Sequence, residues 1–412
     1  MRVVIAPDSF KESLSSPEVA AALARGWLRA VPDSECVCVP LADGGEGTVH
    51  ALVEATGGRL ETRSVRGPLG EPVTAAFGVL GGAGPLTAVV EVAAASGLGL
   101  VLVDERDAGR ASSHGTGELI AAALDLGVDR LIIGLGGSAT TDGGVGMARA
   151  LGVQFLDAAG DEVGEGGVEL GGITTVDLSG LHPGLARCEV VAACDVDNPL
   201  TGPSGAAPIF GPQKGADSEL VQILDGNLDV LAEAIRRTGA AADPEQPGSG
   251  AAGGIGYAVL ALLGGELRPG LEIVADAVGL DAHLDGADLV ITGEGQLDAQ
   301  SLAGKTPVGV MRRAKQRGIP VLAVAGSLGD GVDELIEAGM TAVISVVPGV
   351  VSLRQALVDA EANLEHTGCT LGAVWRAARQ ADFQGRLSDS AVPSKGPHAD
   401  PVDRPQPERP RH

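Results

Sequence analysis

The chain has 412 residues, enough for two domains or one large one, and its 44% hydrophobic content can build sizeable cores. Aromatic residues make up only 2%, so the cores must consist of Val, Leu, Ile and Ala. This favours α/β layers and argues against base stacking on aromatic side chains. The formal net charge of −25 disfavours nucleic acid as a partner, because nucleic-acid binders usually present a basic face.

Five cysteines occur without a C-x-x-C pair, and their odd number suggests reduced thiols in the cytosol. The N-terminus leads directly into a strand pattern without signal-peptide features, and no uninterrupted apolar stretch reaches the about 20 residues of a membrane span. We therefore expect a cytoplasmic protein without a membrane partner. The sequence does not determine its oligomeric state.

The first part of the chain is predicted to begin with alternating strands and helices. These are a strand at 2–6, a helix at 17–30, a strand at 35–40 and a helix at 45–55. Three successive strands are expected next, where Gly and Pro separate apolar runs. Their ranges are 59–66, 73–80 and 87–92.

The rest of the chain combines helices with short strands. In the middle we expect helices at 115–126, 145–151, 218–238 and 251–263, strands at 130–133 and 189–193, and a hairpin-like pair of 153–156 with 162–163. Regular alternation returns from residue 287. There we expect strands at 289–292, 321–325 and 342–346 and helices at 306–317, 332–338 and 353–380.

The two ends of the chain therefore resemble each other, whereas the middle differs. We expect an α/β fold of two domains: a discontinuous Rossmann-like parallel-sheet domain, 1–66 and 286–380, and an inserted mixed α/β domain, 67–285. The cleft between them is the expected active site. Residues 381–412 are rich in Pro, Asp, Ser and Arg, and we interpret them as a disordered tail.

Glycine-rich segments that carry a carboxylate or a lysine recur along the chain. Glycine lets backbone amides approach a ligand closely, and carboxylates bind metal ions or accept protons. At strand ends they indicate a site for a charged, metal-bound ligand, most simply a nucleoside triphosphate. The segments are APDSFK (6–11), ADGGEGT (42–48), GLGGSATTDGG (134–144), CDVDNP (194–199) and GEGQLD (293–298).

The N-terminal segments supply several candidate site residues. Lys11 is a candidate to neutralise a phosphate or a substrate carboxylate, and Asp8 to hold a metal or orient a hydroxyl. Asp43 and Glu46 precede a helix among three glycines, where two acids exceed what capping requires. The alternatives are an ordinary Asx turn at Asp8 and a simple N-cap at Asp43.

The later segments supply further candidates. Asp195 follows a buried strand and is a candidate general base or metal ligand. Lys214 lies on a tight FGPQKG loop, and 249–254 (SGAAGG) opens a helix as a phosphate cradle or, equally, as a close packing site. Glu294 and Asp298 could share one Mg²⁺ if their turn is helical; if it is extended, only Glu294 faces the site.

Two other nucleotide motifs are incomplete. Strand 130–133 leads into a G-x-G-x-x-A dinucleotide fingerprint, but the glycines at 143–144 would break the helix that must follow. Lys305 lies in a GKT triplet without the upstream glycine of a Walker A loop, so it is a candidate phosphate contact or a surface lysine. No G-x-S-x-G or H-E-x-x-H motif occurs, and His114 is expected to start a helix.

Taken together, these segments resemble the glycerate kinase type I family of bacteria. The matching stretches are APDSFK (6–11), ADGGEGT (42–48), GTGELI (115–120), GGSAT (136–140), ACDV (193–196) with NPL (198–200), IFGPQKG (209–215), GAAGG (250–254) and ITGEG (291–295). Each alone is weak, but eight in register are specific. They cover residues 1 to about 378, so the tail lies outside the resemblance.

The resemblance implies ATP- and Mg²⁺-dependent phosphorylation of D-glycerate in a cleft between two α/β domains. We expect Asp195 to receive the proton of the glycerate hydroxyl, with Lys11 and Asp8 as further catalytic residues. The expected nucleotide contacts are Gly136, Gly137, Ser138, Gly253, Gly254, Lys214 and Lys305, and the expected metal ligands are Asp43, Glu46 and Glu294.

The expected product is 2-phosphoglycerate, with 3-phosphoglycerate as the alternative. Two other functions stay open at this point. One is a nicotinamide-dependent hydroxy-acid oxidoreductase, and the other is a non-catalytic metabolite-binding protein.

Overall fold

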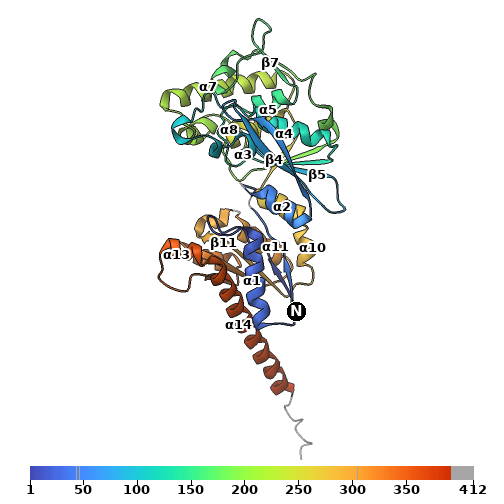
Figure 1. Cartoon of the computed structure of the whole chain (residues 1–412), viewed down its shortest axis with the longest axis vertical. Coiled ribbons are helices and arrows are strands. Elements are labelled where there is room, and N and C mark those ends of the chain that lie inside the picture. Colours follow the sequence, from blue (N-terminus) through green and yellow to red (C-terminus); the bar gives the residue numbers. More distant parts are fainter. Residues whose placement is uncertain (43, 46, 304, 391–412) are drawn as a thin grey trace, which may run out of the picture.

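Two β-sheets, each covered by helices, organise the chain into two lobes (Figure 1). The computed structural model describes residues 1–42, 44, 45, 47–303 and 305–390. In Figure 1 the lower lobe holds both ends of the described chain and the upper lobe holds its middle. Helix α2 (Thr48–Thr56) lies between them, and α10 (Leu280–Leu284) lies at the upper end of the lower lobe. The expected α/β fold, with both ends of the chain in one sheet, is confirmed.

The lower lobe is built on a five-stranded sheet in the order β13–β12–β11–β1–β2. All its neighbouring strands are parallel, so their carboxyl ends lie along one edge. The strands are β1 (Arg2–Ile5), β2 (Glu35–Cys38), β11 (Leu289–Leu297), β12 (Val321–Leu328) and β13 (Ala342–Ser345). The helices are α1 (Ser16–Ala30), α11 (Thr306–Lys315), α12 (Val332–Ala338), α13 (Leu353–Val358) and α14 (Ala360–Ser390).

Helices α1 and α14 cross closely because glycines lie at their contact. A Cβ atom on Gly26 would lie 1.9 Å from the carbonyl oxygen of Glu365, and one on Gly368 would lie 2.4 Å from that of Leu23. The single helix expected at 353–380 is divided near Asp359, and its second part continues to Ser390. Helix α14 therefore includes 381–390, the first part of the expected tail. The first proline of that tail, Pro393, comes after the helix, so no proline interrupts it. Residues 391–412 lie outside the described residues.

The upper lobe is built on a six-stranded mixed sheet in the order β10–β9–β6–β5–β4–β3. Strands β10, β9, β6 and β5 are parallel, whereas β5, β4 and β3 form an antiparallel meander. The strands are β3 (Arg59–Arg66), β4 (Pro72–Val79), β5 (Thr87–Glu91), β6 (Arg130–Gly134), β9 (Glu189–Ala193) and β10 (Glu266–Arg268).

Strand β3 corrects the expected boundary at residue 66. All of β3 pairs with β4, and the turn between them is closed by the Gly67 amide, which donates to the Glu71 carbonyl. The chain therefore enters the upper sheet before Arg59, because a hairpin keeps adjacent strands in one sheet. The other limits of the two domains stay a prediction.

Helices cover both faces of the upper sheet. They are α3 (Val92–Ser96), α4 (His114–Asp125), α5 (Val145–Ala150), α6 (Ala206–Phe210), α7 (Ser218–Arg236), α8 (Ala251–Ala261) and α9 (Gly270–Ala277). Short 3₁₀ helices lie at Leu98–Leu100, Val103–Glu105, Gly167–Gly172, Pro183–Arg187, Pro212–Lys214 and Ala299–Ala303.

A small separate sheet differs from the expected hairpin. Strand β7 (Gln154–Leu156) pairs antiparallel with β8 (Thr175–Asp177), and Glu162 makes only an isolated bridge to Leu156. The tight turn is present, because the Asp157 carboxylate accepts the Ala159 and Asp161 amides. The segments that flank this turn are too short to form a continuous ladder of strand hydrogen bonds. The main partner of β7 is therefore β8, farther along the chain.

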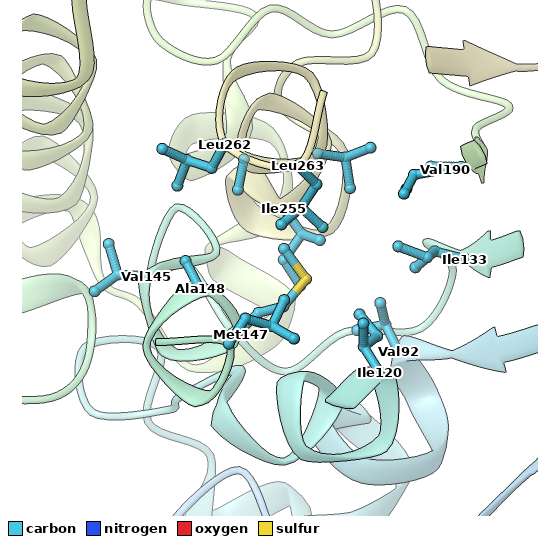
Figure 2. Packing of buried hydrophobic residues seen from close by; sticks show 14 of the residues in the cluster. Val92, Ile120, Ile133, Val145, Met147, Ala148, Val190, Ile255, Leu262 and Leu263 are labelled. Atoms are coloured by element: carbon cyan, nitrogen blue, oxygen red, sulfur yellow. The ribbon is translucent and has the colours of Figure 1, made fainter. Parts of the chain in front are cut away.

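The core of the upper lobe is aliphatic, as the composition predicted. Figure 2 shows Ile120, Met147 and Ile255, from α4, α5 and α8, packing together near Ile133 and Val190 of the sheet. Met147 has no exposed surface. Side chains without polar atoms pack here between helices and sheet, which is the layered arrangement of α/β proteins.

A second hydrophobic cluster joins the two lobes. It includes Val4 and Val290 of the lower sheet together with Val89, Ile132 and Val191 of the upper sheet. Successive residues of a strand face opposite sides, so the upper sheet uses one face for its own core and the other for this shared cluster. The two lobes are therefore held together by continuous apolar packing.

Candidate active site

Gly44 and Gly45, between β2 and α2, lie where the carboxyl edges of the two sheets meet. Gly44 has φ +89°, and a Cβ atom there would come within 2.9 Å of the Ala193 Cβ and of the Gly270 Cα. A Cβ on Gly134, the last residue of β6, would lie 3.0 Å from the Gly44 carbonyl oxygen. Glycine fits this crossing because it has no Cβ and tolerates a positive φ. The glycine-rich sequence here therefore reflects contact between the lobes.

A cavity of about 400 Å³ opens beside this crossing. Its walls include Gly44 and Gly45, the loop after β6, the end of β9 and the start of α8. Five of the predicted site residues line it: Gly136, Gly137, Ser138, Asp195 and Lys214. These residues come from three segments that are distant in the sequence, and the fold brings them together as expected.

Backbone hydrogen bonds to Ser96 and Leu98 anchor the glycine-rich loop after β6. The Leu98 amide donates to the Gly137 carbonyl (2.8 Å), and the Ala139 amide donates to the Ser96 carbonyl (2.9 Å). Asp142 is buried, and its carboxylate accepts the Gly144 and Gly146 amides. Helix α5 begins only after this loop, so the strand-to-helix junction of a dinucleotide fingerprint is absent, as the glycines at 143–144 predicted.

Lys214 is fully buried at the wall of this cavity. Its Nζ donates to Ser138 Oγ (2.9 Å) and to the Thr140 carbonyl (2.6 Å). Burial lowers the pKa of this lysine to about 7, although the nearby Asp142 carboxylate acts in the opposite direction. A buried amine of this kind responds strongly to negative charge placed beside it.

Asp195 lies at the mouth of the same cavity and is exposed. Its Oδ1 accepts the Gly270 amide (2.9 Å), at the first residue of α9. A backbone amide at a helix N-terminus stabilises a carboxylate and fixes its position. One carboxylate oxygen of Asp195 is therefore fixed by the start of α9 at the lining of the cavity, and its role as proton acceptor stays a prediction.

Asp8 and Lys11 line a second cavity of about 450 Å³. Gly45 lines both cavities, so the two are neighbours. The Asp8 carboxylate is buried and accepts the Thr306 hydroxyl (2.6 Å) and the Ser9 amide (2.6 Å). Asp8 thus joins the end of β1 to the start of α11, and the three expected catalytic residues are divided between two adjoining cavities.

Gly253 and Gly254 pack against the loop after β6. A Cβ atom on Gly253 would lie 1.9 Å from the Thr140 carbonyl oxygen, and the Gly253 carbonyl accepts the Gly143 amide (2.9 Å). Their neighbours Ala251 and Ala252 line the first cavity instead. The observed contacts are those of close packing, and a nucleotide contact by these glycines stays a prediction.

Glu294 lies within β11, and its Oε1 accepts the Ser301 hydroxyl (2.8 Å). The strand is extended through Leu297, which rules out the helical turn in which Glu294 and Asp298 would share a cation. Lys305 precedes α11 as its N-cap residue. The predicted metal ligands Asp43 and Glu46 lie outside the described residues.

Within the part of the chain that the structure describes, no group of three or more His, Cys, Asp and Glu side chains could hold a metal ion. His114 is the first residue of α4, as expected, and burial lowers its pKa.

Sequence reasoning missed Glu91, which ends β5 at the same sheet edge. Its side chain is 9% exposed, and its Oε1 accepts the Val49 amide (2.8 Å) in the first turn of α2. A residue at the end of a strand of the upper sheet thereby caps α2. The only signal in the sequence is an acid at the end of an apolar strand, which by itself does not reveal its partner.

Comparison with known proteins now identifies the family. The model of the glycerate kinase family matches residues 3–376. A glycerate kinase of Bacillus subtilis is 47% identical over 379 residues, covering 92% of this chain and 99% of that protein. A glycerate 2-kinase of Escherichia coli is 49% identical over 364 residues, covering 88% and 95%. The chain belongs to the glycerate kinase family.

A solved structure agrees with the fold of this glycerate kinase family member. The crystal structure of a putative glycerate kinase 2 from Salmonella typhimurium superposes with a TM-score of 0.85 at 48% identity. It covers 92% of this chain and 99% of the other chain. The resemblance stated from the eight motifs is confirmed, and the chain is a kinase. No helix among the described residues is long and apolar enough to cross a membrane.

Proposed function

We propose that this kinase transfers a phosphoryl group from ATP to a hydroxyl group of D-glycerate and that the favoured product is 2-phosphoglycerate. The observation that carries the proposal is the cavity in which a glycine-rich loop, a buried lysine and an oriented carboxylate meet. The name and 49% identity of the E. coli relative favour the 2-phosphate over the 3-phosphate.

Phosphoryl transfer depends on positioning and charge neutralisation more than on covalent catalysis. In the proposed complex the ATP phosphates lie along Gly136, Gly137 and Ser138, which offer amides and a hydroxyl. The glycine at 137, with φ +72°, allows the chain to turn closely around an anion. The Asp195 carboxylate receives the proton of the attacking glycerate hydroxyl.

Residues of the second cavity complete the proposal. Lys11 neutralises phosphate or the glycerate carboxylate, and Asp8 keeps the end of β1 against α11. Since Gly45 lines both cavities, we place the transferred phosphoryl group near this residue. Closure of the lobes over both substrates excludes water and so limits ATP hydrolysis.

Magnesium is part of the proposal as the ion that neutralises phosphate charge. Glu294 is the predicted ligand within the described residues, and its carboxylate oxygen chemistry suits the ion. Asp43 and Glu46 are the other proposed ligands. Gly253, Gly254 and Lys305 are proposed as outer contacts of the nucleotide.

A coupled assay of ADP release tests the function. Purified protein is mixed with ATP, Mg²⁺ and D-glycerate, and the products are separated as 2- or 3-phosphoglycerate. We expect ADP release that depends on both D-glycerate and Mg²⁺, with 2-phosphoglycerate as product. Glycerate-independent release, or none from folded protein, would count against the proposal, and 3-phosphoglycerate would overturn its regiochemistry.

Replacement of Asp195 by Asn tests the proton acceptor. The amide keeps the size of the side chain but cannot take the proton, so kcat is expected to fall by about 10² or more. The matched control is Asp197→Asn, an exposed acid two residues away that is not part of the first cavity's lining. Turnover of Asp195→Asn within about threefold of wild type would exclude Asp195 as the base.

A further inference from the structure

Ser138 and Lys214 form a side-chain pair at the wall of the first cavity. Both are buried, with exposures of 6% and 2%, and both line the cavity. Lys214 Nζ donates to Ser138 Oγ at 2.9 Å. Its second bond, to the Thr140 carbonyl at 2.6 Å, holds the amine against the loop that carries Ser138.

The direction of this hydrogen bond determines what the serine can do. A serine hydroxyl has one proton to donate and two lone pairs to accept with. An anionic ligand beside Lys214 favours its charged form, which has protons only. In that form the hydroxyl accepts from Lys214, as the hydrogen bond has it, and its own proton points elsewhere. Within the described part of the chain no protein group accepts that proton, so it is available to an acceptor in the cavity.

We propose that Lys214 is a positioning residue that holds the Ser138 hydroxyl as a donor toward an anionic oxygen of the bound substrate. The inference rests on the proposed function and deepens it. Two ligand groups could provide this anionic oxygen: an ATP phosphate or the glycerate carboxylate. The ligand contact is made by Ser138, and Lys214 acts through it.

The backbone around the pair is closely packed. Gly215, directly after Lys214, has φ +95°, and a Cβ there would lie 2.4 Å from the Arg106 carbonyl oxygen. On the other side, Thr140 is in close contact with Gly253. Close packing on both sides restricts the backbone that carries the lysine and the serine, and a restricted site loses less entropy on binding.

A double-mutant cycle tests the proposal. The variants are Lys214→Met, Ser138→Ala and the double mutant, and the Kd values of MgATP and of D-glycerate are measured separately by calorimetry. We expect each single change to weaken binding of the same one ligand by about tenfold to hundredfold. The double mutant is expected to bind that ligand within about twofold of Ser138→Ala, because Lys214 has no effect without the hydroxyl.

The outcomes distinguish a positioning role of Lys214 from a direct contact between Lys214 and the ligand. If the two losses multiply, Lys214 contacts the ligand itself and the inference is overturned. Unchanged affinity for both ligands in Ser138→Ala would overturn it as well. The ligand whose affinity falls identifies the source of the anionic oxygen. Wild-type protein that binds neither ligand would refute the proposed function and the inference together.

Two further variants guard against a purely structural effect. Lys214→Gln keeps an N–H donor near the serine and is expected to recover part of the lost affinity; it replaces Lys214→Met in the cycle if that variant does not fold. Lys315→Met, an exposed lysine whose Nζ bonds to the Ala338 carbonyl, is the control and should leave both Kd values unchanged. A loss of affinity for both ligands together with lower thermal stability would indicate a structural role.

Discussion

At the scale of single residues, the buried amine of Lys214 is unusual because, among the described residues, no carboxylate forms a hydrogen bond or ion pair with it. Its two partners are a hydroxyl and a carbonyl oxygen, which compensate only part of the cost of removing an ammonium group from water. The pKa therefore falls to about 7. Phosphate bound beside it would favour the charged form again.

This lysine makes stability depend on pH in a defined direction. Its pKa is about 7 in the folded chain and near the ordinary 10.5 when unfolded, so the unfolded chain binds more protons between these values. Wild-type stability should therefore rise, relative to Lys214→Met, as pH increases from about 7 to 10.5, by on the order of a few kcal/mol. Below pH 7 the difference should be constant.

Urea unfolding at pH 6.5, 8 and 9.5 measures this difference. Lys315→Met, with its exposed side chain, provides the control and should track wild type at every pH. Parallel pH curves for wild type and Lys214→Met would show that Lys214 titrates normally.

At the scale of elements, glycines decide how closely helices approach one another. Gly26 of α1 lies against the backbone of α14. Gly226 of α7, in contrast, is exposed, and a Cβ atom there would meet nothing within 4 Å. The same residue type in mid-helix thus serves packing at one position and only lowers helix propensity at the other.

The two glycines should respond to alanine in opposite directions. Gly26→Ala forces α1 and α14 apart and is expected to destabilise by about 3 kcal/mol, as overpacking does. Gly226→Ala should stabilise by about 0.5–1 kcal/mol, since alanine favours the helix and has room. Free energies of urea unfolding measure both. An equal effect of the two changes would contradict the close crossing of α1 and α14.

At the scale of the whole molecule, the shared apolar cluster links the lobes. Leu271 of α9 belongs to it together with side chains of both sheets. If either lobe unfolded alone, the other would expose part of this cluster to water, at a cost of roughly 25 cal/mol per Å² of apolar surface. This cost favours unfolding of both lobes in one step.

We expect a single cooperative unfolding transition. Trp27 and Trp375, the only tryptophans of the chain, pack in one cluster of the lower lobe, so their fluorescence reports that lobe. Far-UV circular dichroism reports both lobes. The two signals should give the same urea midpoint, whereas a clear separation of midpoints would mean that the lobes unfold independently.

Deletion of residues 391–412 should leave catalysis intact. The family match ends at residue 376, and both cavities are lined by residues far before the deleted segment. We expect kcat and both KM values of the shortened chain to stay within about twofold of wild type. A larger change would give the C-terminal segment a part in the active site.

Much of the molecule was predictable because its signals are local. The periodicity of apolar residues indicated most helices and strands, and the scarcity of aromatic residues indicated aliphatic cores. The glycine-rich loops at strand ends located the first cavity, since parallel strands bring their carboxyl ends to one edge. Gly136, Ser138 and Asp195 were predicted in this way, and all three line that cavity.

Other features depended on neighbours that are distant in sequence. The pairing of β7 with β8, the place of β3 in the upper sheet and the cap that Glu91 gives to α2 all depend on long-range contacts. The sequence by itself determined which segments fold as helices, strands and ligand loops, because backbone preference and apolar periodicity are local. Only the tertiary structure decided how buried Lys214 is and which partners it has, because desolvation depends on every segment packed around a group.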